Sequence, residues 1–251
     1  SPAIEVKNLR KEFGGVVAVN DLCLTFAQGQ VSALIGPNGA GKTTVFNLVT
    51  GFLQPTSGGV LLNGQTLTGM KPHRIAAMGI GRTFQNVQVF PAMTVLENVM
   101  VGRHLRSRSG MIVSCLLPPM LRPEEKRVRE SARAWLDAVG LAGHADRPAG
   151  SMPLGSQRML EIARAMALEP SVLFLDEPAS GLNARETADM GDLIMKIKAM
   201  GITVVLVEHD MELVMDISDK VAVVNFGSLI AEGTPREVQA NPDVINAYLG
   251  A

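Results

Sequence analysis

Several classes of protein require features that this sequence lacks. Its 251 residues include only two cysteines, Cys23 and Cys115, which lie far apart and outside any metal-type spacing. That scarcity argues against a disulfide framework and a cysteine metal site and favours a reducing compartment, so we expect both cysteines to pack as ordinary core residues. The formal net charge is −1, which gives no basic surface for DNA or RNA, and we expect no nucleic-acid partner.

Long hydrophobic runs are also absent from the sequence. No stretch approaches the roughly 20 uninterrupted apolar residues that a membrane span needs, and residues 1–6 have neither the basic nor the apolar region of a secretory signal. We therefore expect a cytosolic protein. The most apolar candidate for a surface segment, residues 111–121, is too short to cross a bilayer. It has two readings, a packed helix or loop and a membrane contact.

What the sequence does contain is a succession of short apolar runs separated by helical stretches. Apolar residues make up 47% of the chain, enough for one large domain or two small ones. Continuous β-branched runs are typical of parallel strands covered on both faces, so we predict an α/β layer structure. One covering helix follows the helical spacing from Met190 to Met200 and ends at Gly201. The predicted strands are residues 31–35, 172–175, 202–207 and 221–225.

The middle of the chain has a different pattern. From about residue 86 to residue 167 the strand signals vanish. Val128, Ala132, Trp135 and Val139 mark an amphipathic helix that ends at Gly140. We predict a single domain in which residues 1–86 and 161–251 form the α/β core and residues 87–160 form a helical insertion.

A phosphate-binding loop is the clearest chemical motif. Residues 36–43 read G-P-N-G-A-G-K-T, directly after the strand predicted at 31–35 and before a short helical stretch ending at Gly51. The glycines allow backbone N–H groups and the helix N-terminus to surround an anion. Lys42 would reach the β- and γ-phosphates and the Thr43 hydroxyl would ligate Mg²⁺. The motif predicts a nucleoside triphosphate site, and the alternative is a glycine-rich turn without a ligand.

Two adjacent acids end the strand predicted at 172–175. Burying both carboxylates is costly unless they meet a cation, and Mg²⁺ bound by Asp176 beside the phosphates would supply one. Glu177 would then polarise the attacking water. The alternative is that both acids cap the next helix.

Two further polar residues gain meaning from their positions. His209 follows the strand predicted at 202–207, at the strand end where open α/β sheets bind ligands. Gln85 lies at the entry to the helical insertion, within possible reach of Mg²⁺ and water. Taken alone, a histidine is usually an ordinary surface residue or a satisfied core residue, and Gln85 alone is also a weak signal. His73, His104 and His144 have no such context.

Together, these motifs resemble the ATPase subunits of ABC transporters in order and spacing over essentially the whole chain. The resemblance implies a P-loop NTPase (RecA-like) core with a mixed, mainly parallel sheet and a helical subdomain, and it implies ATP and Mg²⁺ as ligands. Residues 36–43 correspond to the Walker A loop, Asp176 and Glu177 to the end of Walker B, Gln85 to the Q-loop and His209 to the switch histidine. The implied catalytic residues are Glu177, His209 and Gln85, and the implied metal ligands are Thr43, Gln85 and Asp176.

Further contacts with nucleotide are implied by the same resemblance. Phe13 matches the aromatic residue that stacks on adenine, where Tyr is commoner, and residues 180–183 (S-G-L-N) resemble the D-loop, which usually ends in Asp. The residues implied to contact a nucleotide from these segments are Phe13, Gly36, Asn38, Gly39, Ala40, Gly41, Lys42, Thr43, Thr44 and Asn183.

The family's signature, L-S-G-G-Q, is altered in this chain. Residues 152–158 read M-P-L-G-S-Q-R, with Pro153 in the place of Ser and only Gly155 left of the glycine pair. In the family this segment presents a helix N-terminus to the γ-phosphate bound by a second subunit. Because proline is tolerated in a first helical turn and Gly155 keeps an approachable N–H, we expect a weakened anion site. Its residues are Pro153, Leu154, Gly155, Ser156 and Gln157.

Within the family, three features resemble the branched-chain amino acid uptake type: the altered signature, the insertion around residues 103–122 and the ending at residues 244–250. The resemblance implies transmembrane permease subunits, a second ATPase subunit in a homo- or heterodimer, and indirectly a periplasmic or extracellular solute-binding protein. It places the chain peripherally at the cytoplasmic face of the cell membrane. The solute would be a branched-chain amino acid or a similar small polar molecule that never touches this subunit.

Three other functions compete with this interpretation. A soluble ABC-type ATPase acting on DNA or ribosomes would be expected to have a coiled coil, a second cassette or a basic surface. A P-loop kinase would need an acceptor site and has no use for a signature helix or a switch histidine. A non-catalytic or weakly catalytic regulatory nucleotide-binding subunit is excluded least well, because Pro153 alters one element of the site.

Overall fold

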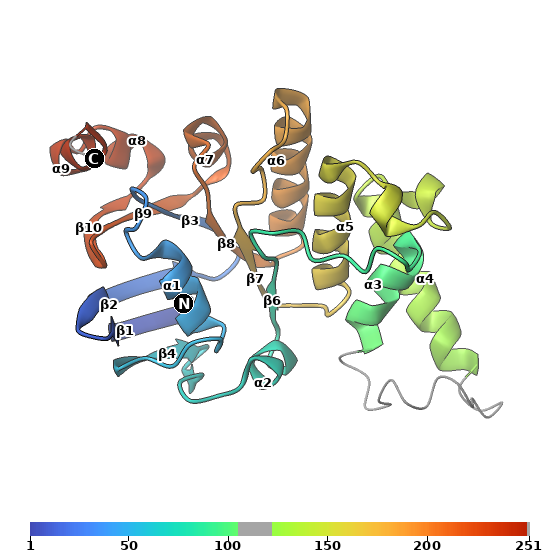
Figure 1. The fold of residues 1–251 in the computed structure, drawn as a ribbon, viewed down its shortest axis with the longest axis horizontal. Helices are drawn as coiled ribbons and strands as arrows, with labels where there is room; N and C mark the ends of the chain where they lie inside the picture. Colours follow the sequence, from blue (N-terminus) through green and yellow to red (C-terminus); the bar gives the residue numbers. More distant parts are fainter. Residues whose placement is uncertain (105–121, 250–251) are drawn as a thin grey trace.

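The computed structural model describes residues 1–104 and 122–249. The predicted surface segment 111–121 and Cys115 lie outside these ranges. A six-stranded sheet with the order β10-β9-β3-β8-β7-β6 forms the centre of the fold (Figure 1). All its neighbouring strands are parallel except β9 and β10, which are antiparallel. The strands are β3 (Val31–Ile35), β6 (Ile80–Arg82), β7 (Val172–Asp176), β8 (Thr203–Val207), β9 (Lys220–Asn225) and β10 (Ser228–Gly233).

The predicted strands are confirmed, and their side chains divide between two cores. Leu34 and Phe174 belong to one hydrophobic cluster, whereas Ala33 and Leu175, one residue away in each strand, belong to another. This alternation is the two-residue period of a strand, applied to a sheet that is buried on both faces. The predicted burial of the sheet on both faces is therefore correct, and the candidate site lies at one edge of this sheet.

The first face is covered by helix α1 (Lys42–Val49) and by a second, four-stranded antiparallel sheet with the order β2-β1-β4-β5. Phe46 and Val49 of α1 pack in the same cluster as residues of both sheets. The sequence analysis did not predict this second sheet. Its strands are β1 (Pro2–Phe13), β2 (Val16–Ala27), β4 (Ser57–Leu62) and β5 (Gln65–Thr66).

Helices cover the other face of the central sheet. Helix α6 confirms the helix predicted around residues 190–200, and a capping box between Asn183 and Glu186 starts it. Met190, Ile194 and Ile197 of this helix are completely buried. The helices with side chains in this core are α5 (Leu154–Met166), α6 (Ala184–Ala199), α7 (Met211–Ile217), α8 (Pro235–Gln239) and α9 (Pro242–Leu249).

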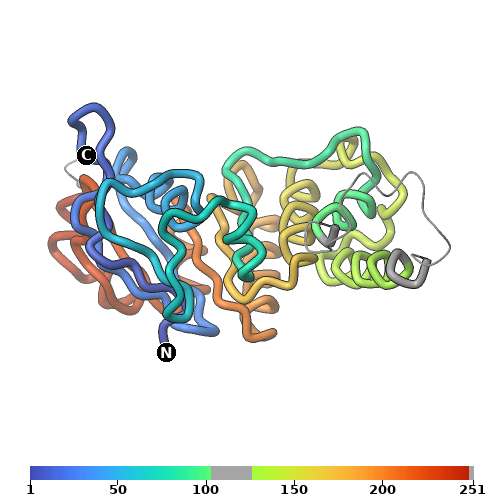
Figure 2. Tube along the Cα trace, turned by 90° about the horizontal axis from the view of Figure 1, so that it is seen from below, coloured from blue at the N-terminus to red at the C-terminus, as the bar shows by residue number. Residues whose placement is uncertain are grey.

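A helical part extends from one end of this layered core (Figure 2). It contains α3 (Val95–His104), α4 (Arg122–Ala138) and two short 3₁₀ turns, Ala142–His144 and Ala149–Ser151. Helix α4 confirms the predicted amphipathic helix. The small helix α2 (Pro72–Ala77) lies beside β6 instead.

Helix α5 joins the two parts of the chain. Ile162 and Met166 pack into the core under the central sheet, whereas Leu160 and Ala163 pack with α3 and α4. The division predicted between residues 160 and 161 falls inside this helix and stays a prediction. None of the helices in residues 1–104 and 122–249 combines the length and the apolar character that crossing a membrane requires.

Cys23 corrects one expectation. It is exposed on β2, and its Sγ accepts a hydrogen bond from the backbone N–H of Asn8. The predicted core role is wrong for this cysteine, because alternate residues of β2 point away from the core.

Candidate active site

Four adjacent parallel strands bring the predicted functional residues to one edge of the sheet. The glycine-rich loop follows β3, and His209 lies two residues beyond β8. Asp176 ends β7, and Gln85 lies three residues beyond β6. Carboxyl ends of neighbouring parallel strands are where open α/β folds bind ligands. The fold therefore gathers residues that are up to 173 positions apart, from residue 36 to residue 209, which is 209 − 36.

The glycine-rich loop is held against the strands behind it. A Cβ at Gly36 would lie 2.1 Å from the carbonyl oxygen of Val224, and a Cβ at Gly41 would lie 2.5 Å from that of Ala18. Gly41 has a φ of 100° and is the N-cap of α1. Only glycine fits such close backbone approaches, so the loop is fixed where its N–H groups can surround an anion.

Lys42 is buried at the start of α1. Its Nζ donates hydrogen bonds to the carbonyl oxygens of Gly36 at 2.6 Å and Pro37 at 2.9 Å. Burial lowers the pKa of Lys42, and the negative charge of Glu177 acts in the opposite direction. The ammonium group thus lies between the phosphate loop and the acids of β7. Thr43 is exposed beside it and Thr44 is half-buried, and their hydroxyls are the next donors along the helix.

Glu177 is in contact with the other two predicted catalytic residues, Gln85 and His209. Gln85 donates from Nε2 to Oε2 of Glu177 at 3.0 Å, and His209 Nε2 lies 2.7 Å from Oε1. When Glu177 is ionised, His209 donates this bond. The Glu177 backbone has a φ of 49°, in the left-handed region that residues with side chains rarely adopt, and its N–H donates to Val207. Both carboxylate oxygens of Glu177 are therefore oriented. The alternative, in which Asp176 and Glu177 cap the next helix, is wrong, because Asn183 caps α6.

Asp176 has one oxygen engaged and one oxygen free among the described residues. Arg82 Nη2 lies 3.1 Å from Oδ2, and both side chains are almost fully buried. The other oxygen, Oδ1, is buried and has no hydrogen-bond partner in the described part of the chain. Burial raises the pKa of Asp176, and Arg82 acts against this effect.

The free oxygen of Asp176 fits a magnesium ion. A buried, unpaired carboxylate oxygen is costly without a partner, and Mg²⁺ is usually bound by one or two carboxylates together with phosphate oxygens. In residues 1–104 and 122–249, no cluster of three His, Cys, Asp or Glu could hold a metal ion by itself. The donor set thus suits a metal that arrives with a phosphate ligand.

Two residues of the site were missed by sequence reasoning. Arg82 is the partner of Asp176. Glu208 is buried and accepts hydrogen bonds from the backbone N–H groups of Ala179, His209 and Asp210. It thereby fixes the turn that carries His209. Neither residue belongs to a motif, so the sequence offered no signal beyond their nearness to Gln85 and His209.

The glycine-rich loop also borders an open cavity of about 740 Å³. His209 and Phe226 line it with the loop residues, and α9 contributes Tyr248. A hydrogen bond joins the Tyr248 hydroxyl to the backbone of Gly36, although burial raises the pKa of this phenol. The cavity is large enough for the phosphates and ribose of a nucleotide.

The altered signature begins a helix, as predicted. Pro153 is the N-cap of α5 and Leu154 is exposed. Gly155 is buried, and a Cβ there would lie 2.6 Å from Oε1 of Glu186. The Glu186 carboxylate thus occupies the space beside the Gly155 Cα, and the expectation that the Gly155 N–H stays approachable remains a prediction. Ser156 and Gln157 are half-buried, and Gln157 donates to the carbonyl of Met152.

Two predicted nucleotide contacts lie apart from this network. Phe13 ends β1 with 46% of its surface exposed, and Lys11 Nζ lies 5.0 Å from its ring centroid. Asn183 uses its side chain as the N-cap of α6. Their contacts with a nucleotide stay predictions.

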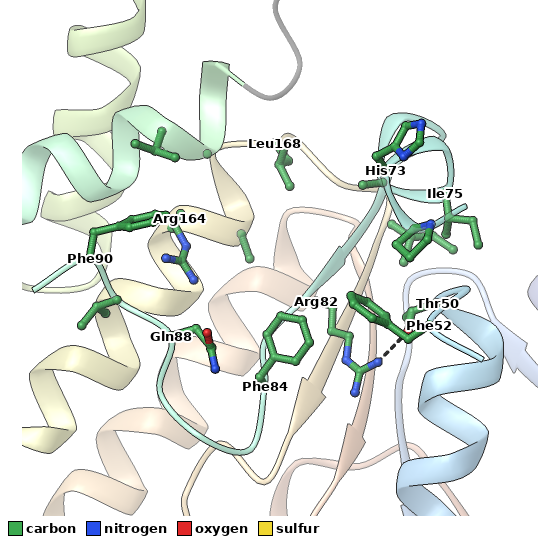
Figure 3. A pocket seen from close by; sticks show the side chains of 17 residues that line it. Thr50, Phe52, His73, Ile75, Arg82, Phe84, Gln88, Phe90, Arg164 and Leu168 are labelled. Carbon is green, nitrogen blue, oxygen red and sulfur yellow. Dashed lines mark hydrogen bonds between the residues drawn. The ribbon is translucent and has the colours of Figure 1, made fainter. Parts of the chain in front are cut away.

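A groove of about 400 Å³ lies beside the Gln85 segment, between the core and the helical part (Figure 3). Phe52, Phe84 and Phe90 form much of its wall, and Arg82 and Arg164 add two guanidinium groups. Arg82 lies beside Phe52 and Phe84 and is hydrogen-bonded to Thr50, as Figure 3 shows. The groove is thus largely apolar with two cations.

Comparisons with known proteins give this site a family context. Residues 19–180 match the ABC transporter family, and residues 228–251 match the family described as branched-chain amino acid ATP-binding cassette transporter. A relative from Pseudomonas aeruginosa, the high-affinity branched-chain amino acid transport ATP-binding protein BraF, is 48% identical over 250 residues, covering 99% of this chain and 98% of the relative. LivG of Escherichia coli, described in the same words, is 47% identical over 250 residues with the same coverage, 99% and 98%.

Solved structures are similar along the whole chain. A nucleotide-free ATP-binding cassette from an ABC transporter is 31% identical, with a TM-score of 0.87 and 100% of both chains covered. Another ATP-binding cassette of an ABC transporter, in its ADP conformation, is 32% identical with the same TM-score of 0.87 and the same coverage of 100%. The predicted fold class is confirmed.

Proposed function

The chain belongs to the ATP-binding proteins of the ABC transporter family, and we propose that its site hydrolyses ATP to drive transport through separate membrane subunits. One observation carries the chemistry. Gln85 and His209 hold the two oxygens of Glu177, one residue beyond the metal-type carboxylate of Asp176. A carboxylate oriented from both sides at a phosphate site is suited to aligning water for attack on phosphorus.

In the proposed reaction, water attacks the γ-phosphorus and the bond to the β–γ bridging oxygen breaks, which yields ADP and phosphate. Glu177 accepts a hydrogen bond from the attacking water, and His209 keeps Glu177 in position and contacts the γ-phosphate. Lys42 and the N–H groups of residues 36–44 stabilise the charge that builds on the phosphate oxygens. Most of the rate gain is positional and electrostatic, as phosphoryl transfer generally requires.

Mg²⁺, when bound, would neutralise charge on the β- and γ-phosphate oxygens. Thr43, Gln85 and Asp176 are the residues that would hold it. Asp176 would contribute the oxygen that lacks a hydrogen-bond partner among the described residues.

The proposed solute is a branched-chain amino acid or a similar small polar molecule. The names of BraF and LivG support this proposal, as does the match at residues 228–251. The solute would cross through permease subunits, delivered by a periplasmic or extracellular binding protein, while this chain binds peripherally at the cytoplasmic face of the membrane. ATP would join it to a second ATPase subunit through the signature segments, and hydrolysis would release that subunit.

We propose the groove beside Gln85 as the contact with the permease. Its three phenylalanines offer apolar surface and its two arginines offer donors to carboxylates or helix-end carbonyls. It adjoins α5, which packs into both cores. A segment seated there would therefore feel any movement between the core and the helical part.

Substituting Glu177→Gln tests the proposed chemistry. Glutamine keeps the size and shape of the side chain, but it removes the charge and basicity and leaves only one oxygen to accept a hydrogen bond, so turnover should fall by about 10²- to 10⁴-fold. ATP affinity, measured with a fluorescent analogue, should stay within about twofold of wild type. Glu212→Gln makes the same change at an exposed position on α7 and should keep wild-type turnover. Unchanged turnover in Glu177→Gln would falsify the role of Glu177.

The alternative function is that of a weakly catalytic or non-catalytic regulatory subunit. It is favoured by one observation, the altered signature with Glu186 beside Gly155. Measuring ATP hydrolysis by the isolated chain, by the chain mixed with a related ATPase subunit, and by Glu177→Gln in the same mixture separates the two functions, because turnover that Glu177→Gln does not lower would support a regulatory subunit. Turnover that appears only with the partner supports a heterodimer, whereas full cooperative turnover by the chain alone speaks for a homodimer.

A further inference from the structure

Arg82 occupies an unusual position for an arginine. Only 7% of its side chain is exposed, and it is paired with Asp176, of which 3% is exposed. Burying a guanidinium is costly unless its donors are satisfied, and both terminal nitrogens of Arg82 donate hydrogen bonds, whereas its Nε is buried without a partner in the described part of the chain. Desolvation lowers the pKa of Arg82, and Asp176 opposes this change. An arginine held in this way is a fixed part of the site, unlike a mobile surface cation.

The hydrogen bonds of the guanidinium reach two elements, the end of α1 and β7. Nη1 donates to Asn47 Oδ1 at 2.8 Å and to Thr50 Oγ1 at 2.6 Å, both at the end of α1 or just beyond it. Nη2 donates to Asp176 Oδ2 at 3.1 Å. The planar fork of arginine allows these bonds to be made together, which fixes the orientation of the group. Arg82 thus bridges the helix that follows the phosphate loop and the strand that carries the acids.

The hydrogen bond from Arg82 makes the two oxygens of Asp176 different from each other. Oδ2 is engaged by Arg82, and Oδ1 has no partner among the residues that the structure describes. A carboxylate free to rotate would exchange its two oxygens, whereas a hydrogen-bonded one presents a single oxygen. Groups that hold a metal ligand in this way tune metal affinity without touching the metal.

The other side of Arg82 belongs to the groove. Its Cζ lies 4.9 Å from the ring centroid of Phe84 and 5.3 Å from that of Phe52. The two rings are in edge contact, with centroids 5.5 Å apart. All three side chains line the groove (Figure 3). A displacement of either ring would therefore change the packing that holds the guanidinium.

We propose that Arg82 is a positioning residue that fixes Oδ2 of Asp176, leaves Oδ1 for Mg²⁺, and ties this carboxylate to the aromatic wall of the groove. The proposal rests on the proposed ATPase function and adds a residue to it. It gives the groove a direct connection to the proposed metal ligand, because Arg82 itself lines the groove.

The test is a metal titration of the full chain. Mn²⁺ replaces Mg²⁺ as the probe, a nonhydrolysable ATP analogue is held at saturation, and electron paramagnetic resonance counts free Mn²⁺. Arg82→Met keeps an unbranched apolar side chain beside the rings of Phe52 and Phe84 and removes the hydrogen bond to Asp176. The Mn²⁺ dissociation constant should rise by about tenfold or more, while the affinity for the analogue without metal stays within about twofold. An unchanged or lower Mn²⁺ dissociation constant would overturn the proposal.

Arg164→Met is the matched control. Arg164 also lines the groove, and its Cζ lies 5.5 Å from the ring centroid of Phe90. Arg164 forms an ion pair with Glu161, whereas the ion pair of Asp176 in the described part of the chain is with Arg82. Its Mn²⁺ dissociation constant should match wild type, and an equal loss in both variants would overturn the specific role of Arg82. Phe52→Leu should raise the constant severalfold, and a wild-type value would remove the groove from the proposal.

Arg82→Lys decides the matter if Arg82→Met does not fold. A lysine ammonium lacks the fork that bonds Asn47, Thr50 and Asp176 together, so the Mn²⁺ dissociation constant should also rise, and a wild-type value overturns the proposal. Wild-type protein serves as the reference for the function itself. If it neither binds Mn²⁺ with the analogue nor hydrolyses ATP, the proposed function fails and this inference with it. If it does both and the variants bind Mn²⁺ normally, the inference alone fails.

Discussion

Replacing Gly41 by alanine tests how firmly the phosphate loop is held from behind. Gly41 is the N-cap of α1, at the point where the loop becomes a helix, and its φ of 100° is unfavourable for any residue with a side chain. The new methyl group would lie 2.5 Å from the carbonyl oxygen of Ala18, whereas Cβ contacts below 3.0 Å are essentially never seen. Ala18 lies within β2, at the register shift between the pairs Lys11–Val19 and Glu12–Val17, so relief of the contact requires a movement of main chain in the loop or in the strand.

The size of the effect follows from these distances. The loop must move by at least 0.5 Å, which is 3.0 Å minus 2.5 Å. A 1 Å misplacement of catalytic geometry can cost about 10²-fold, so a shift of half that size should cost about tenfold in turnover. We expect a similar tenfold loss of ATP affinity, about 1.4 kcal/mol. The left-handed backbone adds about 1–2 kcal/mol of instability.

Gly201→Ala separates the effect of the close contact with Ala18 from the effect of the left-handed backbone. Gly201 has a φ of 83° in the turn after α6, and a Cβ there meets nothing within 4 Å in the described part of the chain. This variant should lose about the same 1–2 kcal/mol of unfolding free energy and keep its ATP affinity. Urea unfolding and titration with a fluorescent ATP analogue measure both quantities. Wild-type ATP affinity in Gly41→Ala would refute the reasoning, since the loop would then not depend on its close approach to β2.

Two further predictions concern the helical part and its junction with the core. Leu136 of α4 is completely buried, so Leu136→Ala should lower the unfolding free energy by about 2–5 kcal/mol in urea. Met195→Ala, on the 39% exposed Met195 of α6, should change it by less than about 0.5 kcal/mol, and equal losses would contradict the core described here. Burial raises the pKa of Glu161, although the N–H of Phe84 and the charge of Arg164 act against it. A raised carboxyl pKa contributes stability that is present at low pH and lost as pH rises through it. Glu161→Gln should therefore gain on wild type in unfolding free energy as pH rises above the ordinary carboxyl pKa of about 4, and identical pH profiles would contradict this.

The sequence was sufficient for the strands that are buried on both faces. Residues 31–35 and 203–207 are fully buried, and their nearly continuous apolar character, V-S-A-L-I and T-V-V-L-V, is what such burial demands. The antiparallel sheet was missed because its strands are exposed on one side and irregular. The pairing of β1 with β2 shifts register four times, which interrupts the alternation that would reveal a strand.

The site residues divide in a similar way into those that a sequence motif reveals and those whose role depends on the folded structure. Lys42, Asp176 and Glu177 could be found because their chemistry is written into contiguous residues. Arg82 and Glu208 could not, because each acquires its role only through a partner distant in the chain, and Arg82 lies 94 positions before Asp176. A lone arginine in a sequence is ordinary, whereas a buried arginine on a metal-type carboxylate is not.

The altered signature has a physical consequence for the proposed dimer. The N-terminus of α5 has Pro153 as its cap, without a side-chain acceptor, and the carboxylate of Glu186 lies beside Gly155. Glu186 is also the partner of Asn183 in the capping box of α6, so one carboxylate joins the signature segment to the D-loop segment. A negative charge beside a helix N-terminus offsets the attraction that this end offers to an anion.

A nucleotide bound by a partner subunit would therefore be stabilised less by the signature segment of this chain than by a complete L-S-G-G-Q segment. The nucleotide held by this chain's own loop would depend on the partner's signature. The two sites of such a dimer would then differ in strength, which favours a pairing with a different ATPase subunit whose signature is intact.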